Sequence, residues 1–123
     1  MTHSTATVVD RYITLVDRAV HEPDLWEELG SVFAPRATVR FGTREPVSGL
    51  GDIEEFYRGF YSGMADVAHV WNTGVVDDGT LEVRFIASWR TDAGALGSQG
   101  GTEYVSVDAD GLITSLRVEE AGA

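Results

Sequence analysis

The sequence lacks several features on which common functions depend. It has no cysteine among its 123 residues, which excludes disulfide and thiolate chemistry and leaves the cellular compartment open. No apolar run approaches the length needed to span a membrane. Basic residues are few, 9 against 20 acidic ones, and the resulting net charge of −11 repels nucleic acid and anionic lipid. We therefore expect neither a nucleic acid nor a membrane as a partner.

Motifs for metal, phosphate and nucleophile chemistry are also missing. The three histidines, His3, His21 and His69, lie too far apart in the chain to show metal-ligand spacing. The glycine-rich residues 94–101 do not follow the phosphate-loop pattern, and there is no Ser-His-Asp signature. We expect no metal ion and no cofactor.

Length and composition predict one globular domain over residues 1–123. The apolar content of 43% is ordinary for such a domain. Residues 1–5 and 120–123 are expected to be frayed ends. Asp10 and Arg11 interrupt the first apolar stretch, which also has no basic start, so we expect no signal peptide and a cytoplasmic protein.

Residues 67–90 predict two long strands joined at Asp77-Asp78-Gly79. The second strand alternates between apolar and mostly polar side chains, as in a strand with one buried face. A three-residue loop, with Gly79 in the left-handed region, would place His69 and Trp71 on that buried face. A two-residue loop would shift the register by one residue and turn them outward. The turn chemistry favours the three-residue loop, and any function of His69 depends on it.

The remaining periodicity predicts an α+β fold. Three helices are expected over about residues 7–20, over residues 23–34, and from a capping box at Asp52–Glu55 to a stop at Gly63. Further strands are predicted over residues 37–41, 102–107 and 112–119, with loops over 42–51 and 93–101. The result is a cone-shaped, curved, antiparallel or mixed sheet whose three N-terminal helices enclose a pocket, as in a cystatin-like roll.

Several short stretches carry a family resemblance. They are Arg11-Tyr12, Asp17, residues 33–39, Gly49, Ile53, Phe56-Tyr57, His69, Asn72 and Asp110-Gly111. In this order they resemble the nuclear transport factor two-like superfamily, which includes ketosteroid isomerases, dehydratases and SnoaL-type polyketide cyclases. This fold hosts both enzymes and inert binders, so the resemblance predicts the fold and leaves the reaction open.

The resemblance implies roles for individual residues. Tyr12 matches the tyrosine that donates a hydrogen bond to substrate oxygen in ketosteroid isomerases, and Glu103 falls where those enzymes keep a protonated aspartate. Phe41 occupies the position of their proton-shuttling aspartate, so we do not expect a ketosteroid isomerase. Tyr12, Asp17 and His69 resemble the Tyr, Asp and His set of the dehydratase and SnoaL-like branch.

Each catalytic candidate also has a structural interpretation. Tyr12 could be a core residue with a satisfied hydroxyl, and His69 a satisfied core histidine. Asp17 lies at the edge of its helix's apolar arc and could point inward or outward.

Glu103 has two orientations open to it. Pointed into an apolar cone, its carboxyl would have a raised pKa and could act as a general acid. Otherwise it would be partly exposed and paired with Arg117 or Arg90.

Two functions follow for such a protein. One is cofactor-free proton transfer, as in dehydration, isomerisation or aldol cyclisation, on a compact apolar oxygenated ligand. The other is a non-catalytic ligand-binding or assembly module. The expected ligand-binding residues are Phe33, Phe41, Phe56, Phe60, Trp71, Phe85, Trp89 and Leu116. The outer face of the hairpin, which mixes apolar Val70, Val76 and Ile86 with polar residues, predicts a homodimer formed through the sheet.

Overall fold

The computed structural model describes residues 6–121, so the predicted fraying of residues 1–5 and 122–123 lies outside the described part. The elements in chain order are α1 (Ala6–His21), the 3₁₀ helix η1 (Pro23–Ser31), β1 (Phe33–Phe41), β2 (Val47–Ser48), α2 (Leu50–Phe60), β3 (Met64–Val75), β4 (Leu81–Thr91), β5 (Leu96–Val107) and β6 (Ile113–Glu120). No helix among the described residues is long and apolar enough to cross a membrane.

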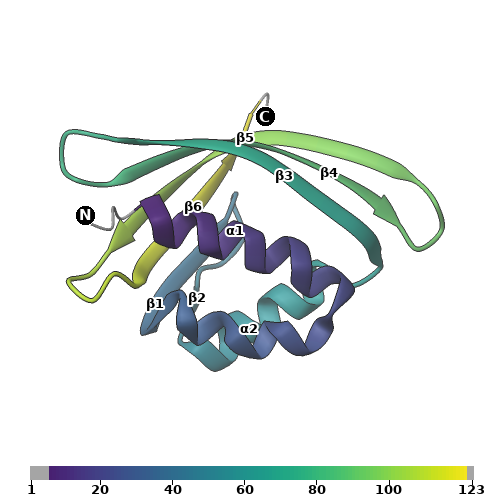
Figure 1. Cartoon of the computed structure of the whole chain (residues 1–123), viewed down its shortest axis with the longest axis horizontal. Helices are drawn as coiled ribbons and strands as arrows, with labels where there is room; N and C mark the ends of the chain where they lie inside the picture. Colours follow the sequence, from purple (N-terminus) through teal and green to yellow (C-terminus); the bar gives the residue numbers. More distant parts are fainter. Residues whose placement is uncertain (1–5, 122–123) are drawn as a thin grey trace.

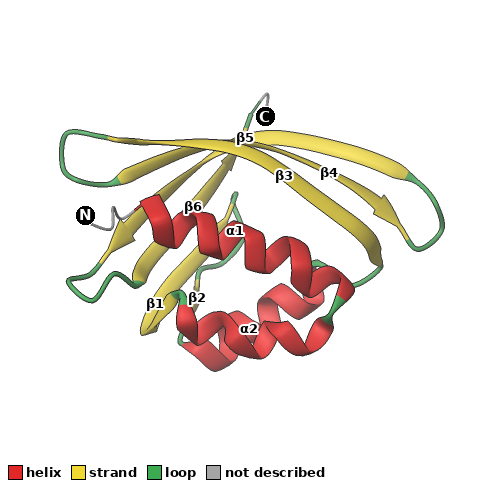
Figure 2. Ribbon diagram, in the orientation of Figure 1, coloured by secondary structure: helices red, strands yellow, loops and turns green. Residues whose placement is uncertain are grey.

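Six strands form one mixed sheet in the order β2-β1-β6-β5-β4-β3. β1 runs parallel to β6, and the other neighbouring strands are antiparallel. The long strands β3, β4 and β5 arch over α1, and the helices lie on the same face of the sheet (Figures 1 and 2). The predicted α+β fold, with a curved sheet and three helices on one side, is confirmed.

The turn between β3 and β4 has the predicted three-residue geometry. The Val76 amide donates to the Thr80 carbonyl at 2.8 Å, and the Gly79 amide donates to the Val76 carbonyl at 2.9 Å. Gly79 has a φ of +85°, a conformation that a residue with a Cβ adopts only at a cost in free energy.

The predicted register of the hairpin is confirmed with the turn. His69 lies opposite Ala87, and Trp71 lies opposite Phe85. Val70, on the other face, is 66% exposed. His69 and Trp71 therefore face the helices.

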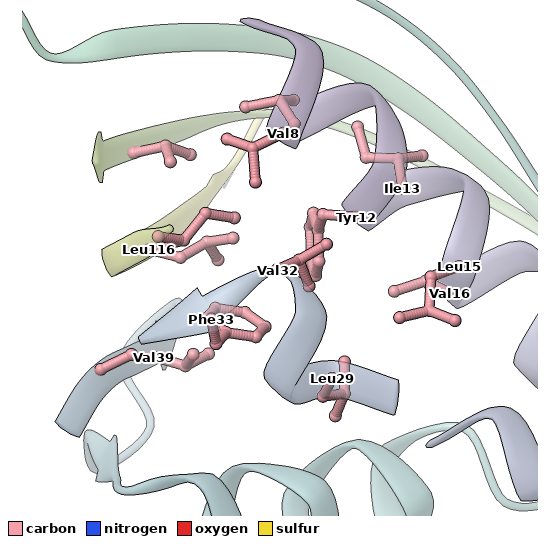
Figure 3. Close-up of a cluster of buried hydrophobic side chains, with 14 of the residues drawn as sticks. Val8, Tyr12, Ile13, Leu15, Val16, Leu29, Val32, Phe33, Val39 and Leu116 are labelled. Carbon is pink, nitrogen blue, oxygen red and sulfur yellow. The ribbon is translucent and has the colours of Figure 1, made fainter. Parts of the chain in front are cut away.

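The packed core lies where α1 and η1 cover the ends of β1 and β6. Val39 and Phe33 are 0% exposed and Leu116 is 1% exposed. Tyr12 points from α1 towards Phe33 (Figure 3), and the two rings meet edge to face with centroids 5.5 Å apart. Stacking of Trp26 on Tyr57 closes the same core from η1 and α2.

Two predicted helix boundaries are wrong. The second helix ends at Ser31 rather than at residue 34, because β1 already begins at Phe33. There the Ile113 amide of β6 donates to the Val32 carbonyl, and this pairing ends the helical hydrogen bonds. The third helix begins at Leu50, within the predicted loop, and its N-cap is Gly49 with no side-chain cap. The Asp52–Glu55 capping box does not form.

Four predicted segments are longer or more regular than expected. β1 begins four residues before the predicted strand, and the predicted loop over residues 42–51 contains β2. Residues 96–101, predicted as part of a glycine-rich turn, belong to β5 and pair with β4 along their whole length. β6 includes Glu120, and the Ala121 amide donates to the Gly100 carbonyl, so the chain is ordered where it was expected to trail off.

Candidate functional site

A cavity of about 190 Å³ lies between the sheet and the helices, next to the packed core. Seven of the predicted site residues line it: Tyr12, Phe41, Phe60, His69, Phe85, Trp89 and Glu103. Its other walls come from Ile13, Val16, Gly42, Tyr61, Met64, Val67, Ala87, Gln99, Val118 and Glu120. All the elements except η1 and β2 contribute.

The other five predicted site residues lie outside this lining. Phe33 and Leu116 are in the packed core. Phe56 packs edge to face on Phe41, with ring centroids 5.0 Å apart, and supports the cavity wall from behind. Trp71 lies beyond the cavity and donates from Nε1 to Asp10 Oδ1 at 2.9 Å. Asp17 contacts His69 and not the cavity.

Asp17 holds His69 at two points. Its Oδ1 lies 2.6 Å from His69 Nδ1, and its Oδ2 accepts the His69 backbone amide at 3.1 Å. The side chains are 7% exposed for His69 and 24% exposed for Asp17. A carboxylate accepts hydrogen bonds only, so His69 Nδ1 carries a proton and donates it to Asp17 Oδ1. Asp17 thus points inward, and Nε2 is the ring nitrogen left for a ligand.

Tyr12 is tied to a second tyrosine. Its hydroxyl lies 2.5 Å from that of Tyr57, which is 0% exposed on α2. Burial raises the pKa of the Tyr12 hydroxyl well above its ordinary value, and the negative charges of Tyr57 and Glu103 would add to the effect. Tyr12 is therefore a neutral hydroxyl. One O–H of the pair is used between the two oxygens, which leaves one for another acceptor.

Glu103 is the buried acidic residue of the cavity. It is 4% exposed, and its Oε1 has no hydrogen-bond partner among the described residues. Arg117 contacts Glu119, and Arg90 contacts Asp66, so neither arginine pairs with Glu103. Burial raises the pKa of the Glu103 carboxyl to about 7, even though the charge of His69 lowers it. Near neutral pH a large fraction of Glu103 is a neutral acid that can donate a hydrogen bond.

His69 and Glu103 reach the cavity from different strands. His69 on β3 lies opposite Ala87 on β4, which lies opposite Gln99 on β5, and Glu103 follows Gln99 by four residues. Two strand spacings, about 10 Å, separate β3 from β5. The imidazole and the carboxyl therefore face a ligand from two sides rather than exchanging a proton directly.

Glycines on β5 make room for the aromatic walls. Gly97 and Gly101 lie on the inner face, opposite Trp89 and Phe85. A Cβ at Gly97 would lie 2.5 Å from the Trp89 ring, and one at Gly101 would lie 3.0 Å from the Phe85 ring and 2.5 Å from the Glu119 carbonyl oxygen. The rings of Trp89 and Phe85 therefore occupy the space that side chains at these two positions would fill.

The sequence analysis missed three kinds of site residue. Tyr57 was part of the family resemblance but received no role, although its place in the stripe of α2 indicates a buried hydroxyl that needs a partner. Tyr61 and Met64 lie at the end of α2 and the start of β3, where periodicity changes and predicts little. Gln99 and Glu120 were assigned to a turn and to a frayed end. No group of three or more potential metal ligands occurs among the described residues.

Comparisons with known proteins agree on the fold. Residues 4–107 match the model of the SnoaL-like domain family. The chain therefore belongs to the SnoaL-like domain family. No curated protein sequence matches the chain.

Three solved structures illustrate the range of similar proteins. An NTF2-like protein of unknown function from Exiguobacterium sp. 255-15 has 23% identity and a TM-score of 0.83, over 94% of this chain and 99% of its own. A putative SnoaL-like polyketide cyclase from Jannaschia sp. CCS1 has 17% identity and a TM-score of 0.75, over 98% and 91%. RV0760c from Mycobacterium tuberculosis, in complex with estradiol-17β-hemisuccinate, has 16% identity and a TM-score of 0.73, over 94% and 93%. At these identities the likeness shows the fold alone.

Proposed function

We propose that this protein binds a compact, apolar, oxygenated ring compound and catalyses a cofactor-free proton transfer on it. The observation that carries the proposal is the unpartnered Glu103 carboxyl, buried in the same cavity that His69 and Tyr12 line. A buried polar group without a partner costs about 1–3 kcal/mol of folding free energy. A ligand that accepts a hydrogen bond from Glu103 would offset that cost.

The size of the cavity limits the ligand. An engineered apolar cavity of about 150 Å³ holds benzene, and sites for drug-sized ligands begin at about 300 Å³. At about 190 Å³, this cavity suits a molecule of one or two rings. Its aromatic walls favour a flat, apolar skeleton.

The proposed roles follow from which atoms reach the cavity. His69 Nε2 takes a proton from a carbon next to a carbonyl, and Asp17 holds the ring and stabilises the imidazolium that forms. Negative charge then develops on the carbonyl oxygen, where the neutral Glu103 and the Tyr12–Tyr57 pair donate hydrogen bonds. The proton returns from Nε2 to another carbon, or to a leaving hydroxyl in a dehydration.

The tyrosine pair can serve this scheme in one of its two hydrogen-bond directions, since either hydroxyl can be the donor. Tyr12 lines the cavity and Tyr57 does not. If Tyr57 donates to Tyr12, the Tyr12 proton is directed at the ligand oxygen.

The proposed chemistry excludes steroid isomerisation. Phe41 stands where that reaction needs a base, and its ring packs against Phe60 with centroids 4.9 Å apart. We expect no turnover of a 5-ene-3-ketosteroid, and Phe41→Asp alone does not install it, because the surrounding rings do not position that carboxylate.

Proton transfer can be tested without knowing the natural substrate. The probe is 1-indanone, a two-ring ketone, and the measurement is deuterium uptake at the carbon next to its carbonyl. We expect the protein to accelerate uptake over buffer, and His69→Gln to lose about 100-fold or more of that acceleration. Glu103→Gln should lose a smaller part. Arg84→Gln, on the outer face, is the matched control and should exchange like the unaltered protein.

The alternative is a binding module of the same fold. The observations in its favour are the Tyr12–Tyr57 and His69–Asp17 hydrogen bonds, which give two of the three polar groups a protein partner. If 1-indanone binds in the cavity and its exchange is not accelerated, the catalytic proposal is wrong and the binding module is the better description.

We also propose a two-fold dimer through the outer face of the sheet. Val70 and Ile86 lie opposite each other there and are 66% and 56% exposed. Light scattering at micromolar concentration should give twice the chain mass of 13.3 kDa, and Ile86→Glu should give the monomer. A monomeric unaltered protein would contradict the dimer.

A further inference from the structure

The charged side chains that line the cavity are mainly acidic. Two glutamates, Glu103 and Glu120, line it, and none of the nine arginine or lysine side chains does so among the described residues. His69 is the one basic group of this lining, and the carboxylate of Asp17 faces its Nδ1. Arg44 packs over the Phe60 ring, 5.4 Å from its centroid, but does not line the cavity.

The two glutamates lie on adjacent strands and face the same way. Glu103 on β5 is opposite Val118 on β6, and Glu120 follows Val118 by two residues on the same inner face. Glu120 is exposed and Glu103 is 4% exposed, so one carboxyl marks the mouth and the other the interior. A ligand enters past a charged carboxylate and ends beside a carboxyl with an unpartnered oxygen.

This arrangement disfavours the binding of an anionic ligand. A buried carboxylate needs a cation or several hydrogen-bond donors, and the walls offer mainly aromatic and aliphatic carbon. Glu120 would repel a carboxylate at the mouth, and an ionised Glu103 would repel one inside. A neutral ketone, ester, lactone, alcohol or amide meets neither penalty and can accept the proton of neutral Glu103.

We infer that the cavity selects uncharged ring compounds over their carboxylate or phosphate counterparts, and that Glu103 and Glu120 set this preference. The inference rests on the proposed function, because it takes the cavity to be the ligand site. It narrows the substrate class to free, uncharged molecules. Carboxylic acids and acyl groups attached to a phosphate-containing carrier are outside this class.

Matched pairs of probes test the preference. Benzamide against benzoate, and 2-naphthamide against 2-naphthoate, keep size and shape while changing charge. Binding is followed by NMR titration of the tryptophan indole signals at pH 7.5 and fixed salt. We expect each amide to bind at least about tenfold more tightly than its carboxylate. A carboxylate that binds as tightly as its amide would overturn the inference.

A pair of variants on one strand locates the cause. Glu120→Gln should reduce the ratio of amide affinity to carboxylate affinity severalfold. Glu119→Gln removes the same charge from the outer face, where Glu119 contacts Arg117, and should leave the difference unchanged. Equal narrowing by both variants would show an effect of overall charge and would also overturn the inference.

The outcomes separate this inference from the proposed function. If amides bind and carboxylates do not, while 1-indanone exchange is not accelerated, charge selection stands and catalysis fails. If exchange is accelerated and carboxylates bind as well as amides, catalysis stands and charge selection fails. If no amide binds, charge selection fails, and 1-indanone exchange alone decides whether catalysis stands.

Discussion

The concave face of one sheet contains two regions that differ in how they are filled. At one end, β1 and β6 meet α1 and η1, and side chains such as Phe33, Val39 and Leu116 are at most 1% exposed. At the other end, β3, β4 and β5 extend past this packing and enclose a cavity of about 190 Å³. One sheet thus supplies both a packed core and a cavity.

The difference comes from side chains rather than from backbone. β5 faces the core with Val105, which is 0% exposed, and faces the cavity with Glu103 and Gln99. Gly97 and Gly101 lie on the same face of β5, under the Trp89 and Phe85 rings. Glycine supplies no side-chain volume, and Glu103 supplies a carboxyl with an unpartnered oxygen. A packed core rarely leaves such a buried oxygen without a partner. The end of β5 that contributes least to folding is therefore the end that can contact a ligand.

The largest expected effect concerns Glu103 and pH. Its folded-state pKa is raised from an ordinary value of 4.5 to about 7, so between these values the folded protein binds more protons than the unfolded chain. Stability due to this group is full below pH 4.5 and is lost as the pH rises through 7. A rise of this size corresponds to about 3 kcal/mol.

Urea melts of the unaltered protein and Glu103→Gln check this pH dependence. The glutamine variant should gain up to about 3 kcal/mol relative to the unaltered protein between pH 4.5 and pH 8. Glu119→Gln, which is exposed, should show no such trend. If Glu103→Gln loses more than about 1 kcal/mol at pH 8, Glu103 is a structural residue and the catalytic proposal should be abandoned.

A smaller effect compares the two regions by making the same change, valine to alanine, once in each of them. Val39→Ala, on β1 in the core, should cost about 2–3 kcal/mol, because it removes buried carbon and leaves a void. Val118→Ala, on β6, should cost about 1 kcal/mol less, because its side chain borders an existing cavity and creates little new void. Equal losses in the free energy of unfolding would contradict the claim that only one region is packed.

Much of the fold could be predicted because each signal was local. The alternation from Leu81 to Trp89 and the Asp77-Asp78-Gly79 turn together determined the register of the hairpin and the inward direction of His69. The amphipathic spacing of α1 placed Tyr12 inside. These signals depend on a few neighbouring residues, and the structure preserves them.

The rest could not be predicted because it depends on pairing between distant segments. Residues 96–101 resemble a turn in isolation, and they form a strand only because β4 and β6 pair with them. Phe33 and Ala34 continue a helical stripe by sequence, yet the pairing with β6 takes them into β1. The predicted capping box at Asp52–Glu55 had the right residue types, but the N-cap is Gly49, with a φ of +88°, three residues before Asp52.

The candidate site shows the same division. Tyr12, His69 and Glu103 line one cavity as their strand and helix faces indicated. Asp17 was predicted together with Tyr12 and His69, and the structure brings it to His69. The partner Tyr57 and the residues Gln99 and Glu120 depend on how α2 and β5 meet α1 and β6. The apolar residues were the least specific prediction, since the sequence could not distinguish rings such as Phe33 that fill the core from rings such as Phe85 that border the cavity.

The smallest expected effect tests whether the Trp89 side chain in the cavity wall can change its position. Gly97→Ala places a methyl group 2.5 Å from the Trp89 ring, a contact that would cost about 1–3 kcal/mol in a packed core. Here the indole can turn into the cavity, so we expect a loss of less than about 1 kcal/mol, together with a changed tryptophan emission and weaker binding of 2-naphthamide. Gly100→Ala is the matched control: its methyl group points to the outer face, 3.5 Å from the Phe85 carbonyl oxygen, and should change none of the three measurements. Because neither glycine has a positive φ, backbone strain does not complicate the comparison. A loss of 2 kcal/mol or more in Gly97→Ala, with unchanged emission, would show that Trp89 is held as rigidly as a core residue. In that case the part of the cavity wall formed by Trp89 and β5 would be packed as tightly as the core, and the two regions would not differ there.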